Sequence, residues 1–246
     1  MQFIPKVFHQ VWVGPDDPPA ESGRFRETWL RHHPDWEIRL WGDNDFGWLK
    51  NRALFERATS YTQKADIAKY ELIERYGRVY LDFDMECLKP ITDLCSGVDL
   101  FAGWEPDGGI NVAIFGATPN HRFLREVVAT MPAWCLIHGN DRVDIQTGPE
   151  LLTHVAIRQG WTARRGVTFF PTHFFYPYNW NEWPRPEGPF PDSYAVHQWA
   201  LSAQGAPGIP GKLSDLLPGS LLEARMAVSA LACEARMGIK RRTERP

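Results

Sequence analysis

The pattern of apolar and polar residues predicts a strand, a loop, a helix and a second strand at the start of the chain. Residues 7–12 are rich in the β-branched and aromatic residues that are typical of a strand. Residues 14–19 are rich in Gly, Pro and Asp, which predicts a loop where a ligand could bind at the strand end. Apolar residues recur at helical spacing over 21–33 until Pro34 ends the pattern. Alternation over 36–41 predicts the second strand.

Helical and strand patterns continue to alternate along the next hundred residues. Two helices are expected over 45–57 and 62–76, and Gly77 is placed to end the second one. An apolar strand over 78–85 follows directly. Further apolar runs cover 100–104 and 112–115, and further helical patterns cover 119–131 and 148–159. Strands that alternate with helices indicate an α/β sandwich with a largely parallel sheet.

The last part of the chain changes character twice. Residues 169–191 are crowded with Pro, aromatics and Asn, which predicts an irregular packed loop or lid. The Gly/Pro-rich residues 205–211 predict a linker, so we expect one folded domain over 1–204 and a linker with a helical tail over 205–246. The tail ends in basic residues: it could lie on an anionic membrane surface, or it could be a solvated or packing helix.

Composition and charge narrow the class of protein. The chain has 246 residues, of which 43% are hydrophobic and 23% charged, as in an ordinary soluble domain with a sizeable core. The formal charge of −3 gives no general attraction to nucleic acid, and we expect no such partner. The start lacks the apolar run of a secretory signal, and no window approaches the roughly 20 apolar residues of a membrane span. We therefore expect a cytoplasmic protein.

The cysteines and aromatic residues indicate less about the class of protein. The four cysteines show no C-x-x-C spacing, which favours reduced thiols over a disulfide framework. The 11 Trp, 14 Phe and 7 Tyr residues could stack on sugar rings or bases, but they could equally fill the core.

Three carboxylates lie at alternate positions near the end of the strand predicted over 78–85. In an extended strand, Asp82, Asp84 and Glu86 would share one face. Carboxylates that lie close together repel one another, so a bound cation is the natural compensation. Oxygen ligands with open positions suit Mg²⁺ or Mn²⁺. A bare D-x-D pattern also arises by chance, or as the polar end of a strand.

Upstream, Asp66 and Lys69 lie three residues apart and so share one face of the helix predicted over 62–76. They could form an ordinary surface ion pair. Alternatively, Lys69 could contact phosphate or sugar oxygens while Asp66 accepts hydrogen bonds from hydroxyl groups.

The chain resembles glycosyltransferase family 32, the D-x-D sugar-binding group that includes yeast Golgi initiating mannosyltransferases and bacterial polysaccharide enzymes. The resemblance rests on several segments in consistent order over about residues 4–200: 4–12, 29–37, 65–70, 76–84, and more weakly Asn111, 146–149 and 196–199. It implies a GT-A fold, a nucleotide-sugar donor, a divalent cation and retention of the anomeric configuration.

The resemblance assigns roles to residues at the best-matched positions. Asp82 and Asp84 match the D-x-D motif, with Asp84 as the direct metal ligand and Asp82 reaching the ribose, or the metal through water. Asp66 and Lys69 match a Ser-Asp-x-x-Arg pair that binds the donor sugar. Ala65 replaces the usual Ser and Lys69 the usual Arg, so the planar two-pronged contact of a guanidinium is lost.

Other matches are weaker. Trp12 is similar in position to aromatics that pack on the donor base or ribose, and His197 resembles a late histidine that completes the metal shell. Asn111 and Gln146 match positions that could contact the donor or acceptor. Arg78 stands where the family has Gly or an Ile-like residue, a change expected to be neutral.

The implied activity is transfer of a hexose-type sugar from a UDP- or GDP-sugar to a glycan or lipid-linked saccharide, through front-face attack. The acceptor could be contacted by residues 169–191, and the basic tail could bring the protein to the inner membrane face. The alternatives are a non-catalytic carbohydrate-binding or inactive glycosyltransferase-like protein and, less favoured, an aspartyl-phosphate hydrolase. The hydrolases carry Thr or Val where this chain has Glu86.

Overall fold

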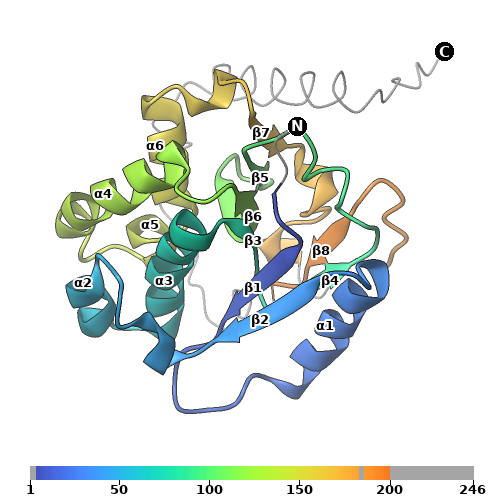
Figure 1. Ribbon diagram of the computed structural model, residues 1–246, viewed down its shortest axis with the longest axis horizontal. Helices are drawn as coiled ribbons and strands as arrows, with labels where there is room; N and C mark the ends of the chain where they lie inside the picture. Colours follow the sequence, from blue (N-terminus) through green and yellow to red (C-terminus); the bar gives the residue numbers. More distant parts are fainter. Residues whose placement is uncertain (1–3, 183–185, 200–246) are drawn as a thin grey trace.

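A mostly parallel sheet forms the centre of the protein (Figure 1). The computed structural model describes residues 4–182 and 186–199, and in this part six strands are ordered β2-β1-β3-β6-β5-β7. Their bounds are Val7–Val11 (β1), Glu37–Trp41 (β2), Arg78–Leu81 (β3), Leu100–Trp104 (β5), Ile110–Ala117 (β6) and Val167–Phe170 (β7). β6 is antiparallel to its neighbours β3 and β5, and the other five strands run in one direction. The largely parallel sheet expected from the alternating pattern is therefore confirmed.

Helices and a small second sheet cover the two faces. The helices α2 (Arg52–Arg57), α3 (Tyr61–Tyr76), α4 (Arg122–Ile137), α5 (Val143–Gln146) and α6 (Pro149–Arg158) lie on one side, whereas α1 (Ala20–His32) lies on the other (Figure 1). Beside α1, β4 (Met85–Cys87) pairs antiparallel with β8 (Ala195–His197). Alternate residues of β3 point to opposite faces: Val79 and Leu81 pack with Trp29 of α1, and Tyr80 packs with Tyr70 of α3.

The third predicted helix forms where the pattern places it. Ser60 caps the first turn of α3 by accepting a hydrogen bond from the backbone N–H of Gln63 (3.1 Å). Gly77 ends the helix with a φ of 65°, and a Cβ there would lie 2.6 Å from the backbone nitrogen of Pro119. Only glycine fits this turn, and β3 begins at the next residue.

Two helix predictions are wrong in extent. The helix expected over 45–57 is divided into a 3₁₀ turn, η1 (Asp43–Phe46), and the short helix α2. Between them the buried carboxylate of Glu71 accepts the backbone N–H groups of Lys50 and Asn51, the second at 2.7 Å. These bonds satisfy backbone groups that a continuous helix would have paired internally.

Helix α4 continues through Pro132 to Ile137 instead of ending at residue 131. Proline lacks the N–H that would bond the carbonyl of Val128. The side chain of Asn51 donates to that carbonyl instead, at 2.9 Å. A partner 77 positions away in the chain therefore makes the interior proline tolerable.

The segment expected to be irregular starts two residues late. Residues 167–170 form β7, and the remainder contains only the 3₁₀ turns η3 (Thr172–Phe174) and η4 (Trp180–Glu182) among its described residues; a further turn, η2 (Trp161–Ala163), precedes β7. Phe175 and Tyr176 are almost fully buried, so this loop is packed onto the body.

Predictions for the linker and the tail over 205–246 fall outside the described residues. Among the residues that are described, no helix combines the length and apolar character needed to cross a bilayer. The cytoplasmic location and the membrane contact of the tail stay predictions.

Candidate active site

The predicted site residues gather at one edge of the sheet. Because β1 and β3 are parallel, their carboxyl ends meet at the same edge, where Trp12 follows β1 and Asp82 follows β3. Helix α3 ends where β3 begins, so its first turns lie at this carboxyl edge too and bring Asp66 and Lys69 there.

The two D-x-D aspartates lie on a turn and not on a strand face. Strand β3 ends at Leu81, the backbone N–H of Asp82 donates to the carbonyl of Ala113 (2.8 Å), and a new strand, β4, begins at Met85. The predicted face of three carboxylates is therefore wrong, because the chain changes direction between them. Glu86 instead accepts a hydrogen bond from the side chain of Gln198 (2.8 Å).

Asp82 and Asp84 are joined by His197. One ligand atom from each of the three residues lies within 4.8 Å of the other two. Antiparallel pairing of β4 with β8 aligns His197 with Met85, and Nε2 of the histidine lies 3.1 Å from Oδ1 of Asp84. Within the described part of the chain, the buried Nδ1 of His197 has no hydrogen-bond partner.

The ionisation of this cluster reflects burial and mutual charge. Burial raises the pKa of Asp82, Asp84 raises it further, and Lys69 and His197 oppose the rise. Burial lowers the pKa of His197, but Asp84 and Asp82 outweigh burial, so its pKa is raised overall. The carboxylates therefore attract positive charge to this turn.

Asp66 and Lys69 form a buried ion pair, which excludes the surface-pair interpretation. Nζ of Lys69 lies 2.7 Å from Oδ1 of Asp66 and 3.8 Å from Oδ1 of Asp82, and the Asp66 and Lys69 side chains are each only 4% exposed. Burial lowers the pKa of Lys69, yet Asp66 and Asp82 outweigh burial and its pKa is raised, so the amine stays charged.

Two further residues hold these carboxylates. The hydroxyl of Thr147 donates to Oδ2 of Asp66 (2.9 Å), and the hydroxyl of Tyr80 donates to Oδ1 of Asp82 (2.6 Å). Sequence reasoning named neither residue. The available signals were weak: Tyr80 stands two residues before Asp82, and Thr147 lies within the weakly matching segment 146–149.

Trp12 lies beside the D-x-D turn. Its ring packs edge-on against Phe83, with ring centroids 5.1 Å apart, and its indole N–H donates to the carbonyl of Asp16 (2.7 Å). The side chain is partly exposed, so part of the ring is anchored by these contacts and part is accessible.

Asn111 and Gln146 are buried and make hydrogen bonds within the protein. Asn111 donates to Glu105 (2.9 Å) and accepts from the N–H of Ala113 (2.7 Å), the residue whose carbonyl holds Asp82. Oε1 of Gln146 accepts a hydrogen bond from the side-chain amide of Gln63 in α3. Both side-chain amides therefore help to hold the segments around the site in place.

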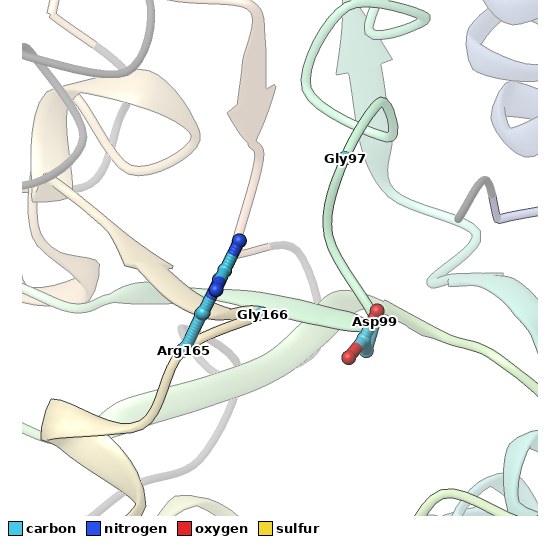
Figure 2. Close-up of a pocket in the computed structure, with 4 residues that line it drawn as sticks. All are labelled: Gly97, Asp99, Arg165 and Gly166. Atoms are coloured by element: carbon cyan, nitrogen blue, oxygen red, sulfur yellow. The ribbon is translucent and has the colours of Figure 1, made fainter. Parts of the chain in front are cut away.

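A separate hollow lies at the opposite edge of the sheet. Gly97, Asp99, Arg165 and Gly166 line it (Figure 2), and they precede the amino ends of β5 and β7. Since β5 and β7 run in the same direction as β3, this amino edge lies away from Asp82.

Comparison with known proteins agrees with the D-x-D assignment. Residues 19–100 match the family model described as a glycosyltransferase sugar-binding region containing the DXD motif. The chain is 33% identical over 140 residues to inositol phosphoceramide mannosyltransferase 1 of Schizosaccharomyces pombe, an alignment covering 52% of this chain and 43% of the relative. It is 28% identical over 162 residues to lactosylceramide 4-alpha-galactosyltransferase of Rattus norvegicus, covering 57% and 41%. The chain thus spans under half the length of these two relatives.

Comparison with solved structures concerns the fold. The PaToxG glycosyltransferase superposes with a TM-score of 0.55 at 14% identity, covering 64% of this chain and 70% of that one. The arrangement that they share is the GT-A fold, so the predicted fold class is confirmed.

Proposed function

We propose that this chain, which belongs to the glycosyltransferases whose sugar-binding region contains the DXD motif, transfers a hexose from a nucleotide-diphosphate sugar to a glycan or lipid-linked saccharide. The observation that carries the proposal is the group formed by the partly buried Asp82 and Asp84 and the buried His197, beside the Asp66–Lys69 pair. Relatives named for mannosyl and galactosyl transfer to ceramide-linked acceptors support a hexose and a glycolipid.

The residues at the D-x-D turn fit a divalent cation. Two carboxylates and the buried imidazole of His197, whose Nε2 lies 3.1 Å from Oδ1 of Asp84, converge there, and this set of oxygen and nitrogen ligands suits Mn²⁺ or Mg²⁺. When bound, such an ion would neutralise negative charge on a diphosphate leaving group.

The chain's own side chains would bind and orient the donor. Lys69 offers a fixed positive charge next to Asp82, where the diphosphate is expected. Asp66 can accept hydrogen bonds from sugar hydroxyls while Thr147 and Lys69 hold its two oxygens. The partly exposed ring of Trp12 can stack on the donor base or ribose.

The proposed stereochemical course is retention by front-face attack. A covalent route needs a carboxylate that is free to attack the anomeric carbon. Asp66 is the carboxylate placed beside the expected sugar, and both of its oxygens are engaged, by Lys69 and by Thr147. This favours a mechanism of positioning and charge stabilisation over one with an enzyme nucleophile.

A hydrolysis screen tests the proposal. Purified protein is incubated with Mn²⁺ or Mg²⁺ and a panel of UDP-, GDP-, dTDP- and CMP-sugars, and nucleotide release is measured. Metal-dependent release of one nucleotide, lost in Asp84→Ala, is expected and would identify the donor. No release with any donor, together with no thermal shift on adding any nucleotide plus metal, would contradict catalysis and favour a carbohydrate-binding role.

A further inference from the structure

Two loops extend the carboxyl edge on the side of Asp82 that is away from Trp12. The strand order places β1 on one side of β3 and β6, β5 and β7 on the other. The β5–β6 connection, residues 105–109, and the segment after β7, residues 171–182, both leave the sheet at this edge, because β5 and β7 run parallel to β3. A donor packed on Trp12 and the D-x-D turn would leave this side for a second substrate.

Long-range hydrogen bonds join the two loops through polar side chains. Oδ1 of Asp107 accepts from the side-chain amide of Asn179 at 2.5 Å, and Oδ2 accepts from the indole N–H of Trp180 at 3.3 Å. The carboxylate of Glu182 accepts the backbone N–H of Asn179 at 2.6 Å, which fixes the turn. Asp107, Asn179 and Trp180 are all partly exposed, so these groups are held in place and remain accessible.

Intermediate residues connect this group to the D-x-D cluster. The indole N–H of Trp199 donates to the carbonyl of Tyr178 (3.1 Å), the residue before Asn179. The ring of Trp199 lies 4.1 Å from that of His197, measured between centroids, and His197 contacts Asp84. A short series of contacts therefore runs from the expected leaving-group site to Asn179 and Trp180.

We propose that Asp107, Asn179 and Trp180 form the subsite that binds the acceptor saccharide, an inference that rests on the proposed function. Carboxylate and amide oxygens have further lone pairs for hydroxyl groups, and an indole offers a flat apolar surface for a sugar ring. The preformed hydrogen bonds among the three residues fix this arrangement before the acceptor arrives. Their place across Asp82 from Trp12 would direct an acceptor hydroxyl toward the donor sugar.

The test separates acceptor use from donor chemistry. The variants Trp180→Ala and Asp107→Asn are compared with wild type for donor hydrolysis and for transfer to methyl α-mannoside, methyl β-galactoside, lactose and myo-inositol. Asp99→Asn, a carboxylate change at the amino edge, is the matched control. We expect kcat/KM for at least one of these acceptors to fall about tenfold or more in both subsite variants. Donor hydrolysis should stay within about twofold, and the control should transfer normally.

Each other result is decisive. Retention of transfer within twofold in both variants would overturn the proposal, as would an equal loss of hydrolysis and transfer. Wild-type protein that hydrolyses a donor but glycosylates none of the four acceptors would overturn it as well. Absence of donor hydrolysis in wild type would instead refute the proposed function. Trp180→Phe, which keeps a ring but loses the hydrogen bond to Asp107, should show a smaller loss than Trp180→Ala if stacking dominates.

Discussion

The charged residues described at the two edges of the central sheet differ in burial. At the carboxyl edge, Asp66 and Lys69 are almost fully buried and Asp82 lies within their charge network. At the amino edge, Arg165 is exposed and Asp99 is only partly buried, around an open hollow (Figure 2). Burying charge costs stability unless the charge is compensated, so the buried ionic groups at the carboxyl edge support the site proposed there.

The largest effect should come from removing the buried cation. Lys69→Met would leave Asp66 and Asp82 without their positive partner, so we expect a loss of about 3 kcal/mol in the free energy of unfolding. For a chain of this size that loss lowers the melting temperature by about 8 °C. Thermal unfolding without added metal measures it.

The comparison variant is Arg165→Met at the exposed edge, which should change stability by less than about 0.5 kcal/mol. Added Mn²⁺ should stabilise Lys69→Met more than wild type, since a bound cation replaces the missing charge. Equal melting temperatures for the two variants would refute the contrast between the edges.

Much of the carboxyl edge could be predicted from local sequence. The helix carrying Asp66 and Lys69 has a helical spacing and a terminal glycine, and β3 follows it directly. These are short-range signals, which is why the helix and the start of the strand were predicted correctly. The alternation that placed Glu86 with Asp82 was misleading, because nothing local shows that the strand stops at Leu81.

The remaining features depend on residues far apart in the chain. Thr147 reaches Asp66 across 81 positions, and Asn51 supports the proline of α4 across 77. The Asp107–Trp180 contact spans 73 positions. Such hydrogen bonds are set by how the helices and loops pack on the sheet, which residue spacing does not encode.

The next effect concerns the hydroxyl that holds Asp66. Thr147→Val keeps the shape but removes the donor, so one oxygen of a buried carboxylate loses its partner. We expect a loss of about 2 to 3 kcal/mol in stability and about a tenfold rise in KM for the donor sugar, with a smaller change in kcat.

Thr147→Ser serves as the matched variant because it restores a hydroxyl at the same place. If Thr147→Ser keeps the wild-type KM and Thr147→Val does not, the effect comes from the hydrogen bond to Asp66. Identical KM values for wild type and Val would show that Thr147 only fills space.

Between the two edges, His9 of β1 is an ionisable residue buried without charge compensation. Its pKa is lowered to about 3 by burial, aided by Arg78 and Arg39, and its Nδ1 accepts the indole N–H of Trp41 (3.0 Å). The unfolded chain binds a proton here below about pH 6.5, whereas the folded protein does not until about pH 3. Stability should therefore fall as the pH drops from 7, by about 2 kcal/mol at pH 5.

Denaturant unfolding of His9→Gln at pH 7 and pH 5 checks this. Between pH 7 and pH 5 the variant should lose about 2 kcal/mol less stability than wild type. It should keep some acid sensitivity, because burial lowers the pKa of His33 as well. If wild type and His9→Gln lost the same stability between pH 7 and pH 5, His9 would not be a source of the acid sensitivity.

The smallest effect should be a gain at the amino edge. Arg78, expected to be a neutral change, has a φ of 77° at the start of β3, a conformation that costs a non-glycine residue about 1–2 kcal/mol. Arg78→Gly would relieve that strain but increase the freedom of the unfolded chain, for a net gain of about 0.5–1 kcal/mol. Arg78 also lowers the pKa of His9, but that pKa of about 3 lies well below pH 5, so the gain should be about the same at pH 5 and pH 7. Arg78→Ala removes the same charge and keeps the strained Cβ, so it should show no gain at pH 7; equal stability of Gly and Ala at pH 7 would place the benefit in charge and not in the backbone.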